Sequence, residues 1–351
     1  MQSNKTRDFS KGSVSGNILR LAGPMIFAQL INVLYNVVDR MYIGHIPDAA
    51  ANALTGVGIT FPIICIVTAF ANLFGGGGAP LFSIAWGRGN RDRAETIISN
   101  SFVLLIGTGI ALTVIVLLIK RPLLYLFGAS DVTFPYADGY LSIYICGSVF
   151  VMISLGMNNF INAQGFARMG MLTVLIGAVL NIVLDPIFIF VLNMGVQGAA
   201  IATVISQLVS AAWAVLFLTG KRVTFRIRRS RMRLQAKLVK DIVFLGFSGF
   251  IMAVTNSGVQ VVCNATLQTF GGDLYVGVMT VINSIREIAN VPVSGLTSAA
   301  QPVMGYNYGA KLYRRVREGI RFTSIACFAI LAVIWLILLL FPEFFIRLFN
   351  E

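Results

Sequence analysis

Long uninterrupted apolar segments decide what this chain can fold into. The first runs from Gly16 to Ile43, which is long enough to cross the ~30 Å hydrocarbon layer of a bilayer as a helix. Of the 351 residues, 57% are hydrophobic and only 12% are charged, whereas about a quarter of an ordinary soluble domain is charged. The segments are continuous, unlike the alternating ~10-residue strands of a membrane β-barrel. The sequence therefore predicts an all-α membrane protein.

Nine segments have the length and apolar character of membrane-crossing helices. They cover residues 16–43, 50–75, 93–119, 136–162, 168–192, 198–219, 238–269, 275–303 and 318–341. The polar N-terminus and the absence of a small-residue cleavage site predict no cleavable signal peptide. The four cysteines lie inside these spans without a CxxC pair, so we interpret them as packing residues rather than as disulfides or metal ligands.

Basic residues are distributed unequally between the two sides of the predicted bundle. Of the 27 Lys and Arg residues, 22 lie in the N-terminal segment or in the loops after spans 2, 4, 6 and 8, and only three lie in the opposite loops. Because positively charged loops remain in the cytoplasm, this predicts a multi-pass protein of the plasma (inner) membrane with a cytoplasmic N-terminus. The net charge of +13 then indicates contact with anionic lipid and not with nucleic acid.

An internal repeat divides the chain into two halves. Gly56-Val57 recurs as Gly277-Val278, and the turn at Gly89 recurs at Gly309, a spacing that indicates duplicated lobes. Six spans precede the long basic loop and three follow it, so we expect about three further helices after Glu351. The predicted organisation is a cytoplasmic N-terminus (1–15), a first lobe of six helices (16–219), a basic inter-lobe loop acting as a hinge (220–240) and a partial second lobe (241–351).

Two carboxylates lie inside predicted spans, where a charge is costly and an acid is a functional candidate. Asp39 and Asp185 both lie in the outer third of the membrane by their distance from the span ends, so they can share one site. Asn181 is one helical turn from Asp185 on the same face. Other oxygen groups available to this site belong to Asn158, Asn159, Tyr140, Tyr144 and Thr203. Two acids in a low dielectric repel when both are charged, so such a site binds a proton or a small cation. Alternatively, either acid has only a structural role, as a hydrogen-bonded group in a contact between two helices. Asn181 would then form a hydrogen bond between helices.

Prolines mark places where spans can bend. Pro24 cannot donate a hydrogen bond to the carbonyl of Arg20, and Pro186 cannot donate to that of Ile182. A bend at Pro24 would swing the segment that carries Asp39, so Pro24 is the candidate hinge of the first span.

The seventh and eighth spans also carry polar groups. Asn256, Gln260, Asn264 and Gln268 recur every four residues, and such a face must meet protein or water rather than lipid. Two interpretations are equally supported: this face lines a central cavity, or its amides form hydrogen bonds with neighbouring spans. Glu287 is a weaker candidate for cation coupling, and an ion pair with another span is the alternative. Arg286, its neighbour in sequence, points about 100° away from it.

Three motifs together are similar to one family. They are Pro24 and Asp39 with Tyr42-Ile43-Gly44, the segment Asn181-Ile182-Val183-Leu184-Asp185-Pro186, and Gln301-Pro302 followed by Gly305-Tyr306-Asn307-Tyr308-Gly309. This set resembles the MATE (multidrug and toxic compound extrusion) transporters, most closely the prokaryotic branch.

The resemblance implies two six-helix lobes around a central cavity. It also implies export of organic cations or drugs in exchange for H⁺ or Na⁺, without another cofactor or a metal centre, and we expect a monomer. A first-lobe cation site formed by Asp39, Tyr140, Asn158, Asn181, Asp185 and Thr203 is implied, with Pro24 as the hinge. Another branch of the family uses acidic residues in spans 7 and 10. Span 7 here carries only amides, which argues against this second arrangement of acids in the present chain.

Three alternative functions remain. A flippase for lipid-linked precursors predicts a cavity rich in Lys and Arg, whereas only Arg40 and Arg286 lie within spans. Arg40 itself is placed to snorkel to the outer headgroups. A membrane enzyme is disfavoured because the chain has one histidine, His45, and no HExxH motif. A non-transporting scaffold has no need for two acids at matched depth.

Overall fold

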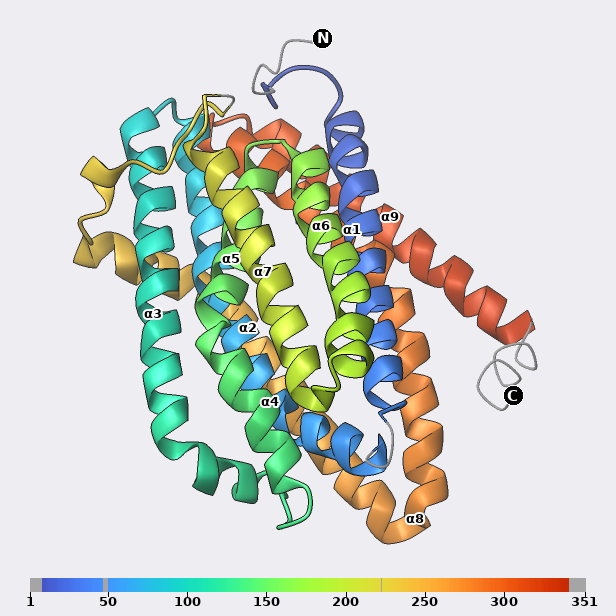
Figure 1. The fold of residues 1–351 in the computed structure, drawn as a ribbon. Helices are drawn as coiled ribbons and strands as arrows, with labels where there is room; N and C mark the ends of the chain where they lie inside the picture. Colours follow the sequence, from blue (N-terminus) through green and yellow to red (C-terminus); the bar gives the residue numbers. More distant parts are fainter. Residues whose placement is uncertain (1–7, 47–49, 222, 341–351) are drawn as a thin grey trace.

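The computed structural model describes residues 8–46, 50–221 and 223–340, with the backbone only for residue 50 and for some residues between 257 and 284. Every regular element of this part of the chain is helical (Figure 1). The elements are α1 (Val14–Ile43), α2 (Ala50–Gly87), α3 (Arg91–Leu126), α4 (Phe134–Cys146), α5 (Ser148–Ala163), α6 (Ala167–Pro186), the π-helix η1 (Ile187–Val191), α7 (Gly195–Thr219), the 3₁₀ turn η2 (Arg229–Arg231), α8 (Ala236–Gly309) and α9 (Tyr313–Leu340). This confirms the prediction of an all-α membrane protein.

Seven helices of the described residues are long and apolar enough to cross a membrane, and the bent pair α4–α5 would make an eighth. The sequence predicted one span over 136–162, which the structure divides into α4 and α5 at an angle of 54°. The break lies at Gly147, where an added Cβ would be 2.4 Å from the side chain of Val204 on α7. The bundle therefore packs α7 into a bend that the apolar pattern alone does not reveal.

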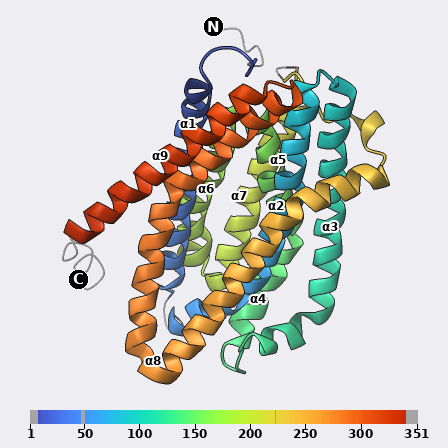
Figure 2. The ribbon, with the colours of Figure 1, turned by 180° about the vertical axis from the view of Figure 1, so that it is seen from behind.

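Helix α8 supplies the seventh and eighth predicted passes as one element. Figures 1 and 2 show that it runs diagonally to the far end of the bundle and then turns back toward the end that carries the N-terminus. The sequence placed two separate spans over 238–269 and 275–303, whereas the helix continues from Ala236 to Gly309. The returning arm carries Arg286 and Glu287, and among the described residues of α8 the stretch that qualifies as membrane-crossing by apolar character is Ala236–Asn256.

We call the end that carries the N-terminus the basic end, because the turns α2–α3, α5–α6 and α8–α9 and the segment 220–235 gather there with most of the cationic residues (Figure 1). Helices α2 and α8 touch backbone to backbone at this end. A Cβ on Gly87 would lie 2.0 Å from the carbonyl oxygen of Tyr306, and one on Gly309 would lie 2.1 Å from that of Ile84. Only glycine allows this approach, so the two helices close the basic end tightly.

The segment predicted as an inter-lobe hinge is fastened along α3. The Glu95 carboxylate is almost fully buried and lies 2.8 Å from Nε of Arg228 and 3.5 Å from Nε of Arg231. One turn further along α3, Asn100 donates to the carbonyl oxygens of residues 231 and 233 and accepts from the backbone N–H of Gln235. The segment is therefore held by a buried acid and a buried amide.

Substitution of Glu95 by alanine should release this segment. Arg228 and Arg231 would lose their ion pairs with a buried carboxylate, so we expect trypsin to cleave after the arginines of residues 226–233 about tenfold faster or more. The control is Glu318→Ala, which removes only an exposed i,i+4 pair with Arg314. Equal cleavage rates in the two variants would contradict this role of Glu95.

Candidate functional site

The two intramembrane acids meet where α1 packs against α6 (Figure 1). Asp39 lies near the C-terminal end of α1, and Asp185 is the penultimate residue of α6. Their side chains contact each other directly. Asp185 is completely buried and Asp39 is half-buried. The structure thus brings together the pair whose depth the sequence predicted to match.

Two of the predicted polar partners join the acids to α7. Asn181 is buried one turn before Asp185, and its amide donates to Oδ1 of Asp185 at 3.0 Å and to Oγ1 of Thr203 at 3.4 Å. Tyr140 on α4 is buried and interacts with Thr203 and with Asp39. Four helices (α1, α4, α6 and α7) therefore contribute to one polar cluster inside the apolar bundle.

Tyrosine hydroxyls surround this cluster, and one of them was missed in the sequence. Tyr35 lies one turn before Asp39 on α1 and is close to both acids. Tyr140 stacks on Tyr144 with ring centroids 6.0 Å apart. The i,i+4 spacing of Tyr35 and Asp39 was the available signal, because residues four apart share a helix face.

Several buried oxygens of the cluster have no hydrogen-bond partner. They include Oδ1 of Asp39, Oδ2 of Asp185 and Oδ1 of Asn181. A buried acceptor left unpaired costs about 1–3 kcal/mol, so three in one place indicate that the site is built to receive a donor or a cation. An all-oxygen set suits a proton or a hard cation rather than a soft metal. Within the described residues there is no group of three or more His, Cys, Asp or Glu side chains that could hold a metal ion.

Asn158 does not join the acid pair. Its Oδ1 atom is buried and unpartnered on α5, where a Cβ on Gly170 of α6 would be 2.9 Å away. Gly170 precedes Asp185 by 15 residues, about 22 Å along the helix axis. Asn158 therefore lies near the basic end, far from the cluster into which it was grouped.

The two prolines differ in their effect on the backbone. Helix α1 is uninterrupted from Val14 to Ile43 with Pro24 inside it, so the predicted hinge is unbroken in this state. At Pro186, by contrast, α6 ends and the π-helix Ile187–Val191 begins. A proline lacks the N–H that would continue the α-helical ladder, and π-turns are frequent at functional sites. Asp185 lies immediately before this irregular turn.

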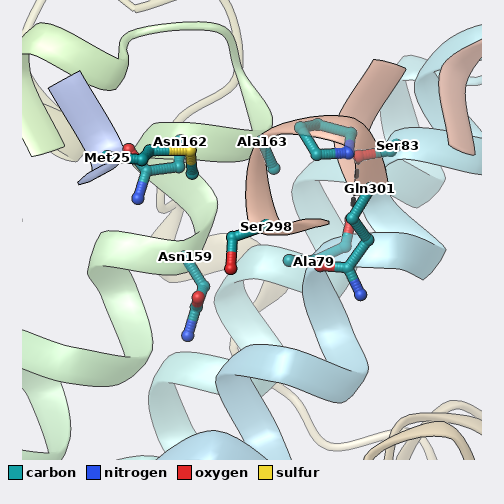
Figure 3. A pocket seen from close by; sticks show the side chains of 9 residues that line it. Met25, Ala79, Ser83, Asn159, Asn162, Ala163, Ser298 and Gln301 are labelled. Atoms are coloured by element: carbon teal, nitrogen blue, oxygen red, sulfur yellow. Dashed lines mark hydrogen bonds between the residues drawn. The ribbon is translucent and has the colours of Figure 1, made fainter. Parts of the chain in front are cut away.

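A small polar cavity of about 30 Å³ lies between α1, α2, α5 and α8 (Figure 3). Figure 3 shows Asn159 and Asn162 of α5 on one side, Gln301 of α8 on the other, and Ser298 between them. The remaining lining residues are Met25, Ala79, Ser83, Ala163 and Pro302. This volume holds one or two water molecules, and the buried Oδ1 of Asn162 lacks a protein partner. The Gln301-Pro302 motif thus forms part of a polar contact between the two halves of the chain.

The candidates of the second half are less well placed. Asn256 is exposed on the first arm of α8, and Glu287 and Arg286 are exposed on the returning arm. The side chains of Gln260 and Asn264 lie outside the described part of the structure, as does that of Gln268. Among the described groups, neither Asn256 nor Glu287 contacts the acid pair.

Comparisons with known proteins give the same family from sequence and from structure. The family model described as MatE matches residues 24–187 and 249–351. The multidrug export protein MepA of Staphylococcus haemolyticus is 24% identical over 342 residues, which cover 97% of this chain and 75% of that relative.

Two solved structures carry the same fold. A multidrug resistance MATE family transporter in an outward-facing conformation is 27% identical, with a TM-score of 0.91, and the match covers 99% of this chain and 77% of that one. A MATE protein solved in a bent conformation is 26% identical, with a TM-score of 0.92, and the match covers 99% and 78%. Since the family model matches most of the chain and the solved folds superimpose along nearly all of it, this chain belongs to the MATE family of membrane transporters.

Proposed function

We propose that this protein is a secondary antiporter that exports organic cations or drugs in exchange for H⁺ or Na⁺. The observation that carries the proposal is the contact between Asp39 and Asp185, with unpartnered oxygens on both acids and on Asn181. The name of the MepA relative, a multidrug export protein, supports the choice of substrate class. The coupling ion and the substrate are the only small molecules that the proposal requires.

The basic end faces the cytoplasm in this proposal, and the protein lies in the plasma membrane as a monomer. Exposed cations such as Arg88, Arg168 and Lys311 gather at this end. Positively charged loops are retained in the cytoplasm and are attracted to anionic lipid of the inner leaflet. Asp39 and Asp185 then lie in the outer half of the membrane, where ions enter from outside.

The acids couple ion binding to the shape of α1. When both carboxylates are charged they repel across a dry site, and this repulsion favours separation of α1 from α6. A bound proton or Na⁺ removes the repulsion and fills the unpartnered oxygens, so it favours contact between the helices. Pro24 is the hinge at which α1 changes shape, because its ring leaves the carbonyl of Arg20 without a helical donor.

Substrate leaves on the side opposite to the basic end in the state described here. Ser298 and Gln301 beside the polar cavity are exposed, whereas Phe82, Val303 and Asn307 nearer the basic end are buried. This pattern supports a cleft that is open to the outside and closed to the cytoplasm. Alternating access requires the opposite arrangement in a second state.

The cavity lining favours drug export over flipping of a lipid-linked precursor. Its polar groups are amides and hydroxyls, and no Lys or Arg lines it. Arg40 instead lies over the ring of Phe61, with its Cζ atom 5.6 Å from the ring centroid. A pyrophosphate would need cations to bind it. A non-transporting scaffold leaves the unpartnered acids without a purpose.

Replacement of either acid by its amide should abolish transport. We expect Asp39→Asn and Asp185→Asn to reduce resistance to a cationic dye such as ethidium to the level of an empty vector, because an amide cannot exchange a proton or neutralise a cation. The measurement is growth of a drug-susceptible host at equal amounts of membrane-inserted protein. Asp131→Asn, at an exposed carboxylate that accepts from Tyr125, should keep full resistance. Full resistance in the Asp39 or Asp185 variant would contradict the coupling role.

Removal of one hydroxyl should weaken ion binding without abolishing transport. Tyr35→Phe deletes a hydroxyl close to both acids, and if this hydroxyl contributes to ion binding as much as one hydrogen bond, about 0.5–1.5 kcal/mol, the coupling-ion concentration at half-maximal transport rises roughly 2- to 10-fold. The assay is dye efflux from proteoliposomes with the pH and sodium gradients imposed separately, which also identifies the ion. Tyr125→Phe is the matched control. An unchanged half-maximal concentration for Tyr35→Phe would exclude this hydroxyl from the site.

A further inference from the structure

Residues 8–12, which precede α1, are packed into the basic end. The side chain of Phe9 is 1% exposed. Its ring lies 5.5 Å from that of Trp86 on α2 and 5.9 Å from that of Tyr306 on α8. Trp86 and Tyr306 are themselves 4.9 Å apart. Phe9 therefore completes an aromatic cluster that takes one ring from each half of the chain.

The backbone of the same segment is held by α8 and α9. Arg315 donates from Nη2 to the carbonyl oxygens of Phe9 at 3.1 Å and of Gly12 at 2.9 Å. Asn307 also donates to the Phe9 oxygen, at 3.2 Å, and its own Oδ1 accepts from Nε of Arg315 at 2.9 Å. Hydrogen bonds from a guanidinium are stronger than neutral ones, and the Phe9 oxygen accepts one from Arg315 together with one from the amide of Asn307. This pattern recognises backbone rather than a charged partner.

A carboxylate adds a third point of attachment. Asp8 accepts a hydrogen bond from the hydroxyl of Tyr306 at 3.1 Å. The hydrogen bond from the Ser10 hydroxyl lowers the pKa of Asp8, so its carboxylate remains charged at neutral pH and is a good acceptor. The aromatic, backbone and carboxylate contacts all join the same short segment to the returning arm of α8 and the start of α9.

The segment continues directly into α1, so it links the two halves of the chain. Beneath it, α2 and α8 cross at Gly87 and Gly309, which closes the basic end. Opening of this end would move α2 away from α8. Phe9 cannot then remain against both Trp86 and Tyr306, and the hold of Arg315 on residues ahead of α1 would be strained or broken.

We propose that residues 8–12 are a latch for the closed basic end, and that Arg315 is the positioning residue that holds the latch. Release of Phe9 and its backbone from Asn307 and Arg315 precedes separation of α2 from α8. The latch rests on the proposed transport function, since only a protein that opens at this end needs it. It assigns a role to the Asn307 of the Gly-Tyr-Asn-Tyr-Gly motif, whose side chain is buried at 1% exposure far from the acid pair.

The test measures opening of the basic end without a drug or an ion gradient. Cysteines replace the exposed Arg168 of α6 and Arg317 of α9 in a chain whose four native cysteines are alanine, and the spin-label distance distribution is recorded in lipid nanodiscs. We expect Phe9→Ala, Arg315→Ala and deletion of residues 1–12 to raise the ratio of long to short distances roughly tenfold or more, because each removes a strong contact of the closed state. Arg315→Lys keeps the charge but loses the planar fork, so its shift should be intermediate.

The control is Arg314→Ala, one residue away on the same helix. The Arg314 side chain is 93% exposed and pairs only with Glu318 among the ion pairs of the described residues, so its substitution should leave the distances unchanged. The proposal is overturned if deletion of residues 1–12 lowers the melting temperature but leaves the distance distribution as it was, which is the result for a purely structural segment. If Arg315→Ala does not fold, the deletion of residues 1–12 still tests whether the latch holds the basic end closed.

The outcome is independent of the antiporter test. If Asp39→Asn keeps full resistance while the latch variants still shift the distances, the antiporter proposal fails and the latch stands. If Asp39→Asn loses resistance and the latch variants leave the distances unchanged, the latch fails and the antiporter proposal stands.

Discussion

Two carboxyl groups that share one dry site are the constraint on which the rest of this structure depends. Asp39 and Asp185 come from helices that are far apart in sequence, and Asn181 donates to only one of their four carboxylate oxygens, at 3.0 Å. A soluble protein could hydrate the others, but a bilayer offers no water. The surrounding helices therefore provide tyrosine, threonine and amide groups and leave some oxygens open. In the proposed antiporter, cation binding at this site would be coupled to the shape of α1, because Asp39 belongs to that helix.

The sequence was sufficient for the acid pair because depth in a membrane can be counted in residues. Asp39 and Asp185 were matched by their distance from span ends, and Asn181 by its spacing of one turn, and the structure brings all three together. The assignment of Asn158 to this site did not rest on such an estimate of depth, and Asn158 lies near the other end of α6. Tyr35 was missed although it obeys the same i,i+4 spacing as Asn181. The family resemblance, drawn from short motifs, is confirmed by the family model, and with it the expectation of a transporter rather than an enzyme.

Other features could not be predicted because they depend on contacts distant in sequence. The bend between α4 and α5 follows from the packing of Val204 against Gly147, and hydropathy alone favours a straight span there. The segment before α8 looks like a solvated basic linker, yet the buried Glu95, more than 130 residues earlier, fixes it in place. In the same way, Phe9 lies in a polar N-terminal segment of the sequence, and only the tertiary structure shows that its side chain is buried between Trp86 and Tyr306.

The glycine crossing at the basic end has a geometric consequence. Gly87 contacts Tyr306, three residues before Gly309, and Gly309 contacts Ile84, three residues before Gly87. The two contacts are thus reciprocal, as in the interface of a twofold symmetric dimer, where residue i contacts residue j and j contacts i. Each helix therefore supplies one glycine and accepts the other at the same crossing, so the two contacts depend on each other. If the basic end opens as proposed, both glycine contacts are lost in the same movement.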